Sequence, residues 1–208
     1  MREIREILAL SPVVPVVTLE DPGRAADVAR ALLAGGIGVL ELTLRTGNAL
    51  ESMRRISREV PQIRLGAGTV LSARQVDEAV EAGAGFLVSP GATPGLLDHM
   101  VSTGLPVLPG VATVSEAMAL AERGLDALKF FPAGPAGGPS YLKALGAPLP
   151  QLTFCPTGGI SAETAPDYLA LPNVACVGGS WLTPSDAIDS GDWARITRLA
   201  AEAARLAS

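Results

Sequence analysis

Short apolar runs alternate with helical patterns along the whole chain. The first run, Val13–Val17, is mostly β-branched and predicts a buried strand. A helix should follow from Pro22 to Gly35, because Asp21 is a suitable N-cap, proline favours the first helical position and glycine ends helices. The same alternation predicts further strands at Val39–Leu42, Ile63–Gly66, Phe86–Ser89, Pro106–Leu108, Ala127–Phe130, Leu152–Cys155 and Val174–Val177. Helical patterns lie between them, for example at Ala73–Ala82, Val114–Glu122 and Ala162–Leu169.

The regular spacing of these strand signals indicates the fold class. They recur at about 20–26 residues, the length of one compact βα unit. We therefore expect an α/β protein, a closed (β/α)8 TIM barrel with an additional N-terminal helix, forming one catalytic domain over residues 1–208. A doubly wound open sheet is the alternative. It needs fewer strands and usually a glycine-rich first turn, which Thr18-Leu19-Glu20 does not provide.

Composition narrows the possible partners. The chain has 48% hydrophobic and 18% charged residues, and its glycines and prolines are dispersed, so one core without a linker is expected. A net charge of −5 argues against nucleic acid. Apolar stretches stay short of the ~18 residues of a membrane span, and the first residues lack a signal-peptide pattern, which predicts a cytoplasmic protein. The two cysteines, Cys155 and Cys176, are interpreted as small buried hydrophobic residues.

Lys129 is the residue around which the chemistry is predicted. It lies in the apolar run Leu125–Pro132, and only one other lysine, Lys143, occurs beside fourteen arginines. A buried amine is costly, so its retention where arginine is otherwise preferred indicates a role that needs a neutral nitrogen. A neutral lysine can attack a carbonyl carbon and form a Schiff base. A lysine that reaches water from a strand end, paired with Asp126, is the structural alternative.

A second strand carries polar residues at every other position. Period-two alternation puts Glu41, Thr43 and Arg45 on one face, toward the barrel axis, and it puts Lys129 and Phe131 on the facing side. Glu41 is thus a candidate acid or base near the lysine, although pairing with Arg45 would give it a purely structural role. Arg45 could clamp a carboxylate through its planar fork.

Glycine pairs follow the last two predicted strands, at Thr157-Gly158-Gly159 and Gly178-Gly179-Ser180. Bare backbone N–H groups at these ends are the usual phosphate site of a barrel. His99, the only histidine, falls in the predicted helix Pro94–Met100 and is expected on the surface. A single imidazole also argues against zinc-dependent carbonyl chemistry, which uses two or three.

Six motifs together resemble the class I aldolases of 2-keto-3-deoxy-6-phosphogluconate (KDPG) and 4-hydroxy-2-oxoglutarate (KHG). They are ELTLRT with Glu41, GAGTV with Thr69, SPG at 89–91, KFFPA with Lys129, CPTGGI at 155–160 and VGGSWL at 177–182. The resemblance covers nearly the whole chain. It implies Entner–Doudoroff cleavage of KDPG to pyruvate and glyceraldehyde 3-phosphate, without a metal or other cofactor, by a homotrimer that binds a 2-keto acid and neither nucleic acid nor membrane.

The resemblance also implies roles for individual residues. Lys129 corresponds to the Schiff-base lysine and Glu41 to the general acid/base. Carboxylate binding falls to Arg45 and Thr69, pocket lining to Pro90 and Phe131, and the phosphate end to Thr157, Gly158, Gly159, Gly179 and Ser180. One departure is the loop Gly134–Gly138, where many members carry an acid.

Other functions remain open on the sequence. A sibling aldolase could prefer 2-keto-3-deoxy-6-phosphogalactonate or unphosphorylated KHG. A phosphate-binding barrel isomerase or synthase could use Glu41 as a base and leave Lys129 non-covalent. A non-catalytic barrel would retain pyruvate without turnover.

Overall fold

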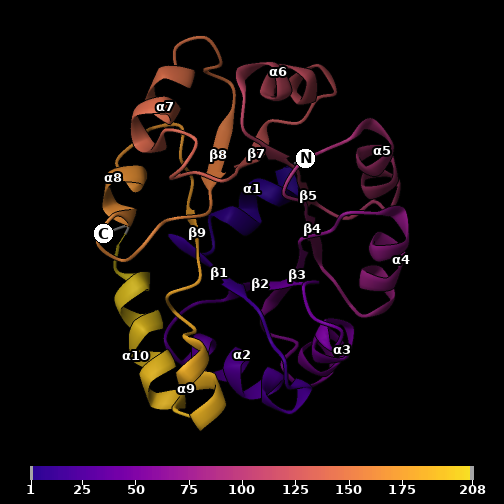
Figure 1. Cartoon of the computed structure of the whole chain (residues 1–208), viewed down its shortest axis with the longest axis vertical. Helices are drawn as coiled ribbons and strands as arrows, with labels where there is room; N and C mark the ends of the chain where they lie inside the picture. The colour runs from indigo at the N-terminus through magenta and orange to yellow at the C-terminus, as the bar shows by residue number, and fades with distance from the viewer. Residues whose placement is uncertain (1, 207–208) are drawn as a thin grey trace.

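A computed structural model describes residues 2–206, with side chains from residue 4, so the ends of the predicted 1–208 domain lie outside the described residues. Strands occupy the interior and helices surround them (Figure 1). The strands are β1 (Val13–Val17), β2 (Val39–Thr43), β3 (Arg64–Gly68), β4 (Phe86–Val88), β5 (Val107–Leu108), β6 (Gly110–Val111), β7 (Ala127–Phe130), β8 (Thr153–Pro156) and β9 (Val177–Gly179). The helices are α1 (Arg2–Leu8), the 3₁₀ turn Pro22–Arg24, α2 (Ala25–Ala34), α3 (Ala49–Glu59), α4 (Ala73–Glu81), α5 (Pro94–Ser102), α6 (Val114–Glu122), α7 (Gly138–Leu145), α8 (Ala165–Leu169), α9 (Ser185–Ser190) and α10 (Trp193–Ala204).

The predicted closed (β/α)8 TIM barrel is wrong. All strand pairs are parallel, but they form a six-stranded half-barrel sheet in the order β5-β4-β3-β2-β1-β9 and a separate three-stranded sheet in the order β6-β7-β8. Within residues 2–206, two isolated bridges lie between these sheets: Phe154↔Val174 joins β8 to the segment before β9, and Thr157↔Gly178 joins the residue after β8 to β9. The fold is therefore α/β with two hydrogen-bonded sheets.

Proline explains both interruptions. The predicted fifth strand, Pro106–Leu108, corresponds to β5 and is followed by Pro109, which has no N–H to donate to a ladder and separates β5 from β6. The chain changes sheets there, since β5 pairs with β4 and β6 pairs with β7. Pro156 likewise ends β8 without a donor toward β9. The sequence predicts a strand over Pro106–Leu108 alone, so the second short strand, β6, was not predicted.

Most predicted elements are confirmed, with shifts at their ends. β1 and α6 have the predicted bounds. The segment Pro22–Gly35 begins with a 3₁₀ turn before α2, and α8 is much shorter than the predicted helix Ala162–Leu169. The last strand begins at Val177, so Gly178 and Gly179 lie within β9 instead of following it.

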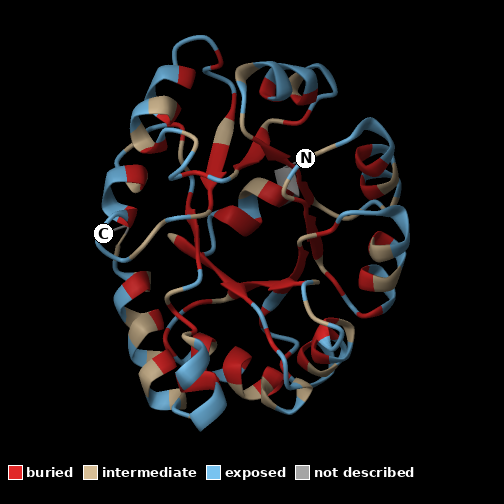
Figure 2. Cartoon of the chain, in the orientation of Figure 1, coloured by how far each residue is buried: buried red, intermediate tan, exposed pale blue. Residues whose placement is uncertain are grey.

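Buried residues concentrate on the strands and on the inward faces of the helices (Figure 2). β1 and β2 are buried at every position, as expected for parallel strands covered by helices. Helix α1 lies at the amino ends of the strands. The Arg5 guanidinium on α1 donates to the backbone oxygens of Asp126 and Gln151, and it pairs with the Asp126 carboxylate at 3.0 Å. Asp126 is therefore not the partner of Lys129.

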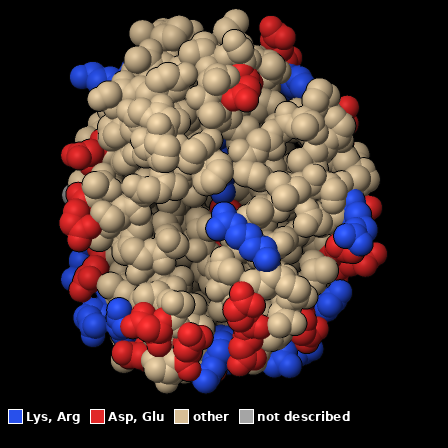
Figure 3. Space-filling view, viewed as in Figure 1, with Lys and Arg blue, Asp and Glu red and all other residues tan. Residues whose placement is uncertain are grey.

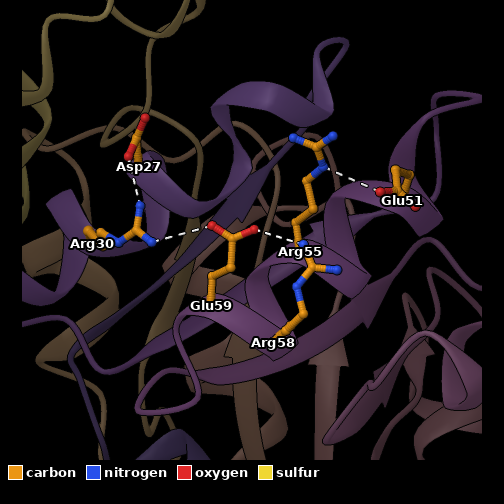
Figure 4. Close-up of polar contacts among 6 residues, drawn as sticks. All are labelled: Asp27, Arg30, Glu51, Arg55, Arg58 and Glu59. Atoms are coloured by element: carbon orange, nitrogen blue, oxygen red, sulfur yellow. Dashed lines mark hydrogen bonds and ion pairs between the residues drawn. The ribbon is translucent and has the colours of Figure 1, made fainter.

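Charged residues lie mostly on the outer helices. Arg30 on α2 contacts Asp27 on its own helix at 2.9 Å and Glu59 on α3 at 3.4 Å (Figure 4). The hydrogen bond from Arg58 holds the pKa of the Glu59 carboxyl below its usual value. Figure 3 shows charged side chains along the lower edge of one face and a basic side chain across a hollow near its middle.

No helix within residues 2–206 combines the length and apolarity needed to cross a membrane.

Candidate active site

The two candidate catalytic residues meet in the interior. Lys129 Nζ on β7 lies 3.0 Å from Glu41 Oε1 and 3.3 Å from Oε2 on β2, a strand of the other sheet. Each residue is only 3% exposed. Glu41 thus pairs with Lys129 and not with Arg45, which removes the structural alternative for both residues. A buried amine and carboxylate at this distance can hold a proton between them and pass it to a bound molecule.

Glycine makes room for this pair. Glu41 lies beside Gly66 in the parallel register, and its carboxyl group passes over Gly68 on β3. A Cβ added at Gly68 would stand 2.7 Å from Glu41 Cδ and 2.5 Å from Cγ. Lys129 has Gly110 as its neighbour on β6. The side chains of Glu41 and Lys129 therefore extend across the interior at positions where the neighbouring strands have glycine and no side chain.

A cavity of about 240 Å³ opens above the pair, at the carboxyl ends of the strands. This volume suits a small metabolite better than a drug-sized ligand. The Phe131 ring is part of its wall, and Lys129 Nζ lies 5.7 Å from the centre of that ring. The complete wall is Val16, Thr18, Arg45, Phe131, Thr157, Gly158, Gly159, Ile160, Gly178, Gly179 and Ser180.

Two larger cavities, of about 520 and 680 Å³, lie elsewhere. One adjoins α1 and the beginnings of β3 to β5, and the other is lined by Arg5, Lys143 and the segment before β8. Glu41 and Lys129 line none of the three cavities, but only the smaller one has Phe131 in its wall, and the centre of that ring lies 5.7 Å from Lys129 Nζ. The smaller cavity is therefore the candidate site.

Arg45 and Thr69 are joined at one side of the cavity. Arg45 is exposed, and its Nε donates to Thr69 Oγ1 at 3.1 Å. Thr69 has φ of 59°, the only positive φ at a non-glycine position in the described chain. A threonine in this region is strained, and such strain often accompanies a functional site. The two terminal guanidinium nitrogens of Arg45 have no side-chain partner among the hydrogen bonds of the described residues, so a carboxylate could bind there.

The opposite side of the cavity is built from glycines and hydroxyls. Gly158 and Gly159 have φ of 98° and 75°, a left-handed conformation that glycine adopts without strain, and they bring no side chain of their own into the cavity. Thr157 packs so closely on Gly178 that a Cβ there would overlap its side chain. The loop at 134–138 adjoins this end, because Gly134 N donates to Gly158 O at 2.9 Å. Backbone donors and hydroxyls of this kind suit an anionic group.

Most of the predicted site residues are gathered at this place. Arg45, Phe131 and the five residues predicted for the phosphate end line the cavity, while Glu41 and Lys129 lie beneath it. Thr69 does not line the cavity, but its hydroxyl accepts a hydrogen bond from Arg45, which does. Pro90 is not part of the cavity wall; its carbonyl instead packs on Gly110, next to Lys129.

Three wall residues, Val16, Thr18 and Ile160, were not predicted. Val16 and Thr18 lie at the carboxyl end of β1, and the rule that barrel chemistry gathers at strand ends could have identified them. Ile160 follows the second glycine of its turn and carried no polar signal. His99 lies outside the site, where its Nε2 is 2.8 Å from Asp77 Oδ1.

The cysteines are buried free thiols, as predicted. Cys155 is the register neighbour of Lys129 on β8. A hydrogen bond with Cys155, together with burial, raises the pKa of the Cys176 thiol well above its usual value. Cys176 therefore stays protonated at neutral pH and behaves as a packing residue.

Comparison with known proteins agrees with this geometry. Residues 4–199 match the family model described as KDPG and KHG aldolase. The chain is 50% identical over 197 residues to the KHG/KDPG aldolase of Escherichia coli strain K12, covering 95% of this chain and 92% of that protein. It is 48% identical over 203 residues to the 2-dehydro-3-deoxy-phosphogluconate aldolase of Zymomonas mobilis, covering 98% and 96%.

Two solved structures are similar to this chain over nearly its whole length. The KDPG aldolase of Legionella pneumophila, with pyruvate captured as a covalent carbinolamine, has a TM-score of 0.94 at 45% identity and covers 96% of this chain and 97% of its own. The Zymomonas mobilis enzyme with 3-phosphoglycerate has a TM-score of 0.93 at 48% identity, with 99% and 97% covered. The chain therefore belongs to the KDPG and KHG aldolase family.

Proposed function

We propose that this protein is a class I aldolase that cleaves KDPG to pyruvate and glyceraldehyde 3-phosphate. The observation that carries the proposal is the buried contact of 3.0 Å between Lys129 Nζ and Glu41 Oε1 beneath the small cavity. A lysine amine provides the covalent nucleophile, and a carboxylate within hydrogen-bond reach provides the proton relay.

The first step joins enzyme and substrate. Glu41 accepts a proton from Lys129, and the neutral amine attacks the C2 ketone of KDPG to give a carbinolamine. Glu41 then returns the proton to the departing hydroxyl group, which leaves as water, and a protonated imine remains on Lys129.

The second step breaks the C3–C4 bond. Glu41 removes the proton of the C4 hydroxyl, and the bonding electrons move into the protonated imine, which becomes an enamine. Glyceraldehyde 3-phosphate leaves. Protonation of the enamine at C3 and hydrolysis of the resulting imine release pyruvate and regenerate the free lysine. Acid–base help of this kind contributes about 10²–10⁴-fold in rate.

Binding roles follow from the two sides of the cavity. We assign the substrate carboxylate to Arg45 and Thr69, which are joined by a hydrogen bond of 3.1 Å. We assign Phe131, which lines the cavity, to contact with the reacting carbons, while Pro90 lies behind the wall against Gly110. We assign the phosphate to the opposite side, to Thr157, Gly158, Gly159, Gly179 and Ser180.

Borohydride reduction in the presence of pyruvate tests the covalent step. We expect a stable adduct on the peptide that contains Lys129 and none on the peptide of Lys143, the other, exposed lysine. Lys129→Ala should abolish cleavage while the matched Lys143→Ala retains it. Glu41→Gln should slow cleavage severely and still permit some imine. An unmodified Lys129, or wild-type cleavage in Lys129→Ala, would refute the proposal.

We also propose that the protein cleaves KHG to pyruvate and glyoxylate. The relative in Escherichia coli carries both substrates in its name. Rates with KDPG and KHG, measured on one preparation, test this range. The native structure named KDPGal is only 29% identical, which favours the gluconate over the galactonate substrate.

We further propose one catalytic domain that assembles as a homotrimer in the cytoplasm. The six family motifs support the trimer, and two free buried thiols are usual in a reducing compartment. Light scattering should give about three times the chain mass of 21.2 kDa, and a monomer would contradict the assembly. Cell fractionation tests the location.

A further inference from the structure

Two threonine hydroxyls form a pair in the wall of the cavity. Thr18 follows β1, is exposed and lines the cavity, and its Oγ1 lies 2.8 Å from Thr43 Oγ1. Thr43 ends β2, two residues after Glu41 on the same inward face, and is completely buried. The pair is thus fixed at its buried end and open to the cavity at Thr18.

The hydrogen-bond capacity of the pair is not used up. Each hydroxyl has one donor and two acceptor sites, and one hydrogen bond between them consumes one donor and one acceptor. Within residues 2–206, neither side-chain hydroxyl has another protein partner. Because Thr43 is enclosed, the unused capacity available to a ligand is at Thr18. If Thr43 donates to Thr18, the Thr18 proton is free to be donated into the cavity.

The position of Thr18 selects a part of the substrate. In the six-stranded sheet, β1 lies between β2 and β9. The segment after β2 carries Arg45, on the carboxylate side, and β9 leads into Ser180, on the phosphate side. Thr18 therefore faces the middle of a molecule that spans the cavity. In the proposed reaction the C4 hydroxyl gives its proton to Glu41, which leaves the C5 hydroxyl for another partner.

We propose that Thr18 is a specificity-determining residue whose hydroxyl binds the C5 hydroxyl of the phosphorylated substrate, with Thr43 as its positioning residue. This inference rests on the proposed aldolase function. It makes the Thr18–Thr43 pair a recognition element for the aldehyde half of the substrate, separate from the groups that form the imine with pyruvate. Pyruvate has no C5, so formation of its imine should not use the pair.

The test compares Thr18→Val, which keeps the shape and removes the hydroxyl, with Thr18→Ser, which keeps the hydroxyl. Loss of one hydrogen bond to substrate predicts that Thr18→Val lowers kcat/KM for KDPG by about 5–10-fold. Its borohydride adduct with pyruvate should change less than about twofold, and Thr18→Ser should stay near wild type in both measurements. Thr18→Ala gives a second hydroxyl-free variant if valine impairs folding.

The outcomes separate this inference from the function on which it rests. Unchanged KDPG cleavage in both hydroxyl-free variants overturns the role of Thr18, and so does an equal loss in Thr18→Ser, which keeps the hydroxyl. A reduced pyruvate adduct in these variants also overturns it, because the imine site itself would then be disturbed. Failure of the proposed function would appear in the wild-type protein, as absence of the pyruvate adduct and of cleavage.

Discussion

Gly68→Ala should slow cleavage strongly, although it replaces neither Glu41 nor Lys129. Gly68 lies at the end of β3, and its backbone does not adopt a positive φ, so alanine meets no conformational strain there. Its new Cβ would stand 2.7 Å from Glu41 Cδ and 2.5 Å from Cγ, and closer still to Oε1. Ordinary contacts begin at 3.4 Å. The carboxyl group must therefore move by about 1 Å to restore normal contacts.

A displacement of this size decides the expected rate. Glu41 Oε1 is 3.0 Å from Lys129 Nζ, and a retreat of about 1 Å takes the pair beyond hydrogen-bond distance. A misplacement of about 1 Å in a catalytic group costs on the order of 10²-fold in rate. We therefore expect kcat for KDPG cleavage to fall by about 10²-fold. Because the lysine itself remains, the pyruvate adduct should still form, although more slowly.

The assay needs a folded protein and a matched control. Gly38, which immediately precedes β2, has nothing within 4 Å of an added Cβ, so Gly38→Ala should retain wild-type kcat. Thermal unfolding of both variants establishes that each is folded. A Gly68→Ala enzyme with wild-type kcat would refute the steric reasoning. A crystal structure of that variant with the Glu41–Lys129 contact intact would refute it as directly.

Three further predictions concern stability and binding. Leu40→Ala, at a completely buried position in β2, should lower the free energy of unfolding by about 2–5 kcal/mol in urea titrations, unlike the exposed Leu71→Ala. Backbone N–H groups at the start of α6 hold the pKa of the Glu116 carboxyl below its usual value of 4.5. Its contribution is present above that value and lost as pH falls through the lowered pKa, so the destabilisation by Glu116→Ala, measured in urea, should shrink in acid. Gly178→Ala should displace Thr157 and raise KM for KDPG more than for KHG.

The contact between Glu41 and Lys129 could be predicted from the sequence because two independent signals agreed. Lys129 was unusual as a charged residue in an apolar strand, and Glu41 belonged to a period-two row of polar residues on another strand. Parallel strands bring such residues to the same end of a fold. The family motifs then supplied roles that composition alone could not. The distance of 3.0 Å between Lys129 Nζ and Glu41 Oε1 agrees with both signals.

Sheet closure could not be predicted in the same way. Strand signals report apolar runs, whereas closure depends on an unbroken series of backbone donors between neighbouring strands. Pro109 removes one donor directly after the fifth predicted strand, and the chain passes there from one sheet to the other. Thr18 was missed for a related reason. A single threonine after an apolar strand looks like ordinary turn chemistry until its partner Thr43 is known.

The chemistry of this interior depends on positions without side chains. Gly68 gives space to Glu41, Gly110 stands beside Lys129, and Gly178 gives space to Thr157. A parallel strand that is buried on both faces normally fills such positions with branched apolar residues. Glycine there weakens the strand and leaves the packing to a neighbour's longer, polar side chain. Each glycine thus lowers the stability of its strand and makes space for a charged side chain or a substrate inside the fold. The loss of rate in Gly68→Ala measures how much the position of the Glu41 carboxylate depends on that space.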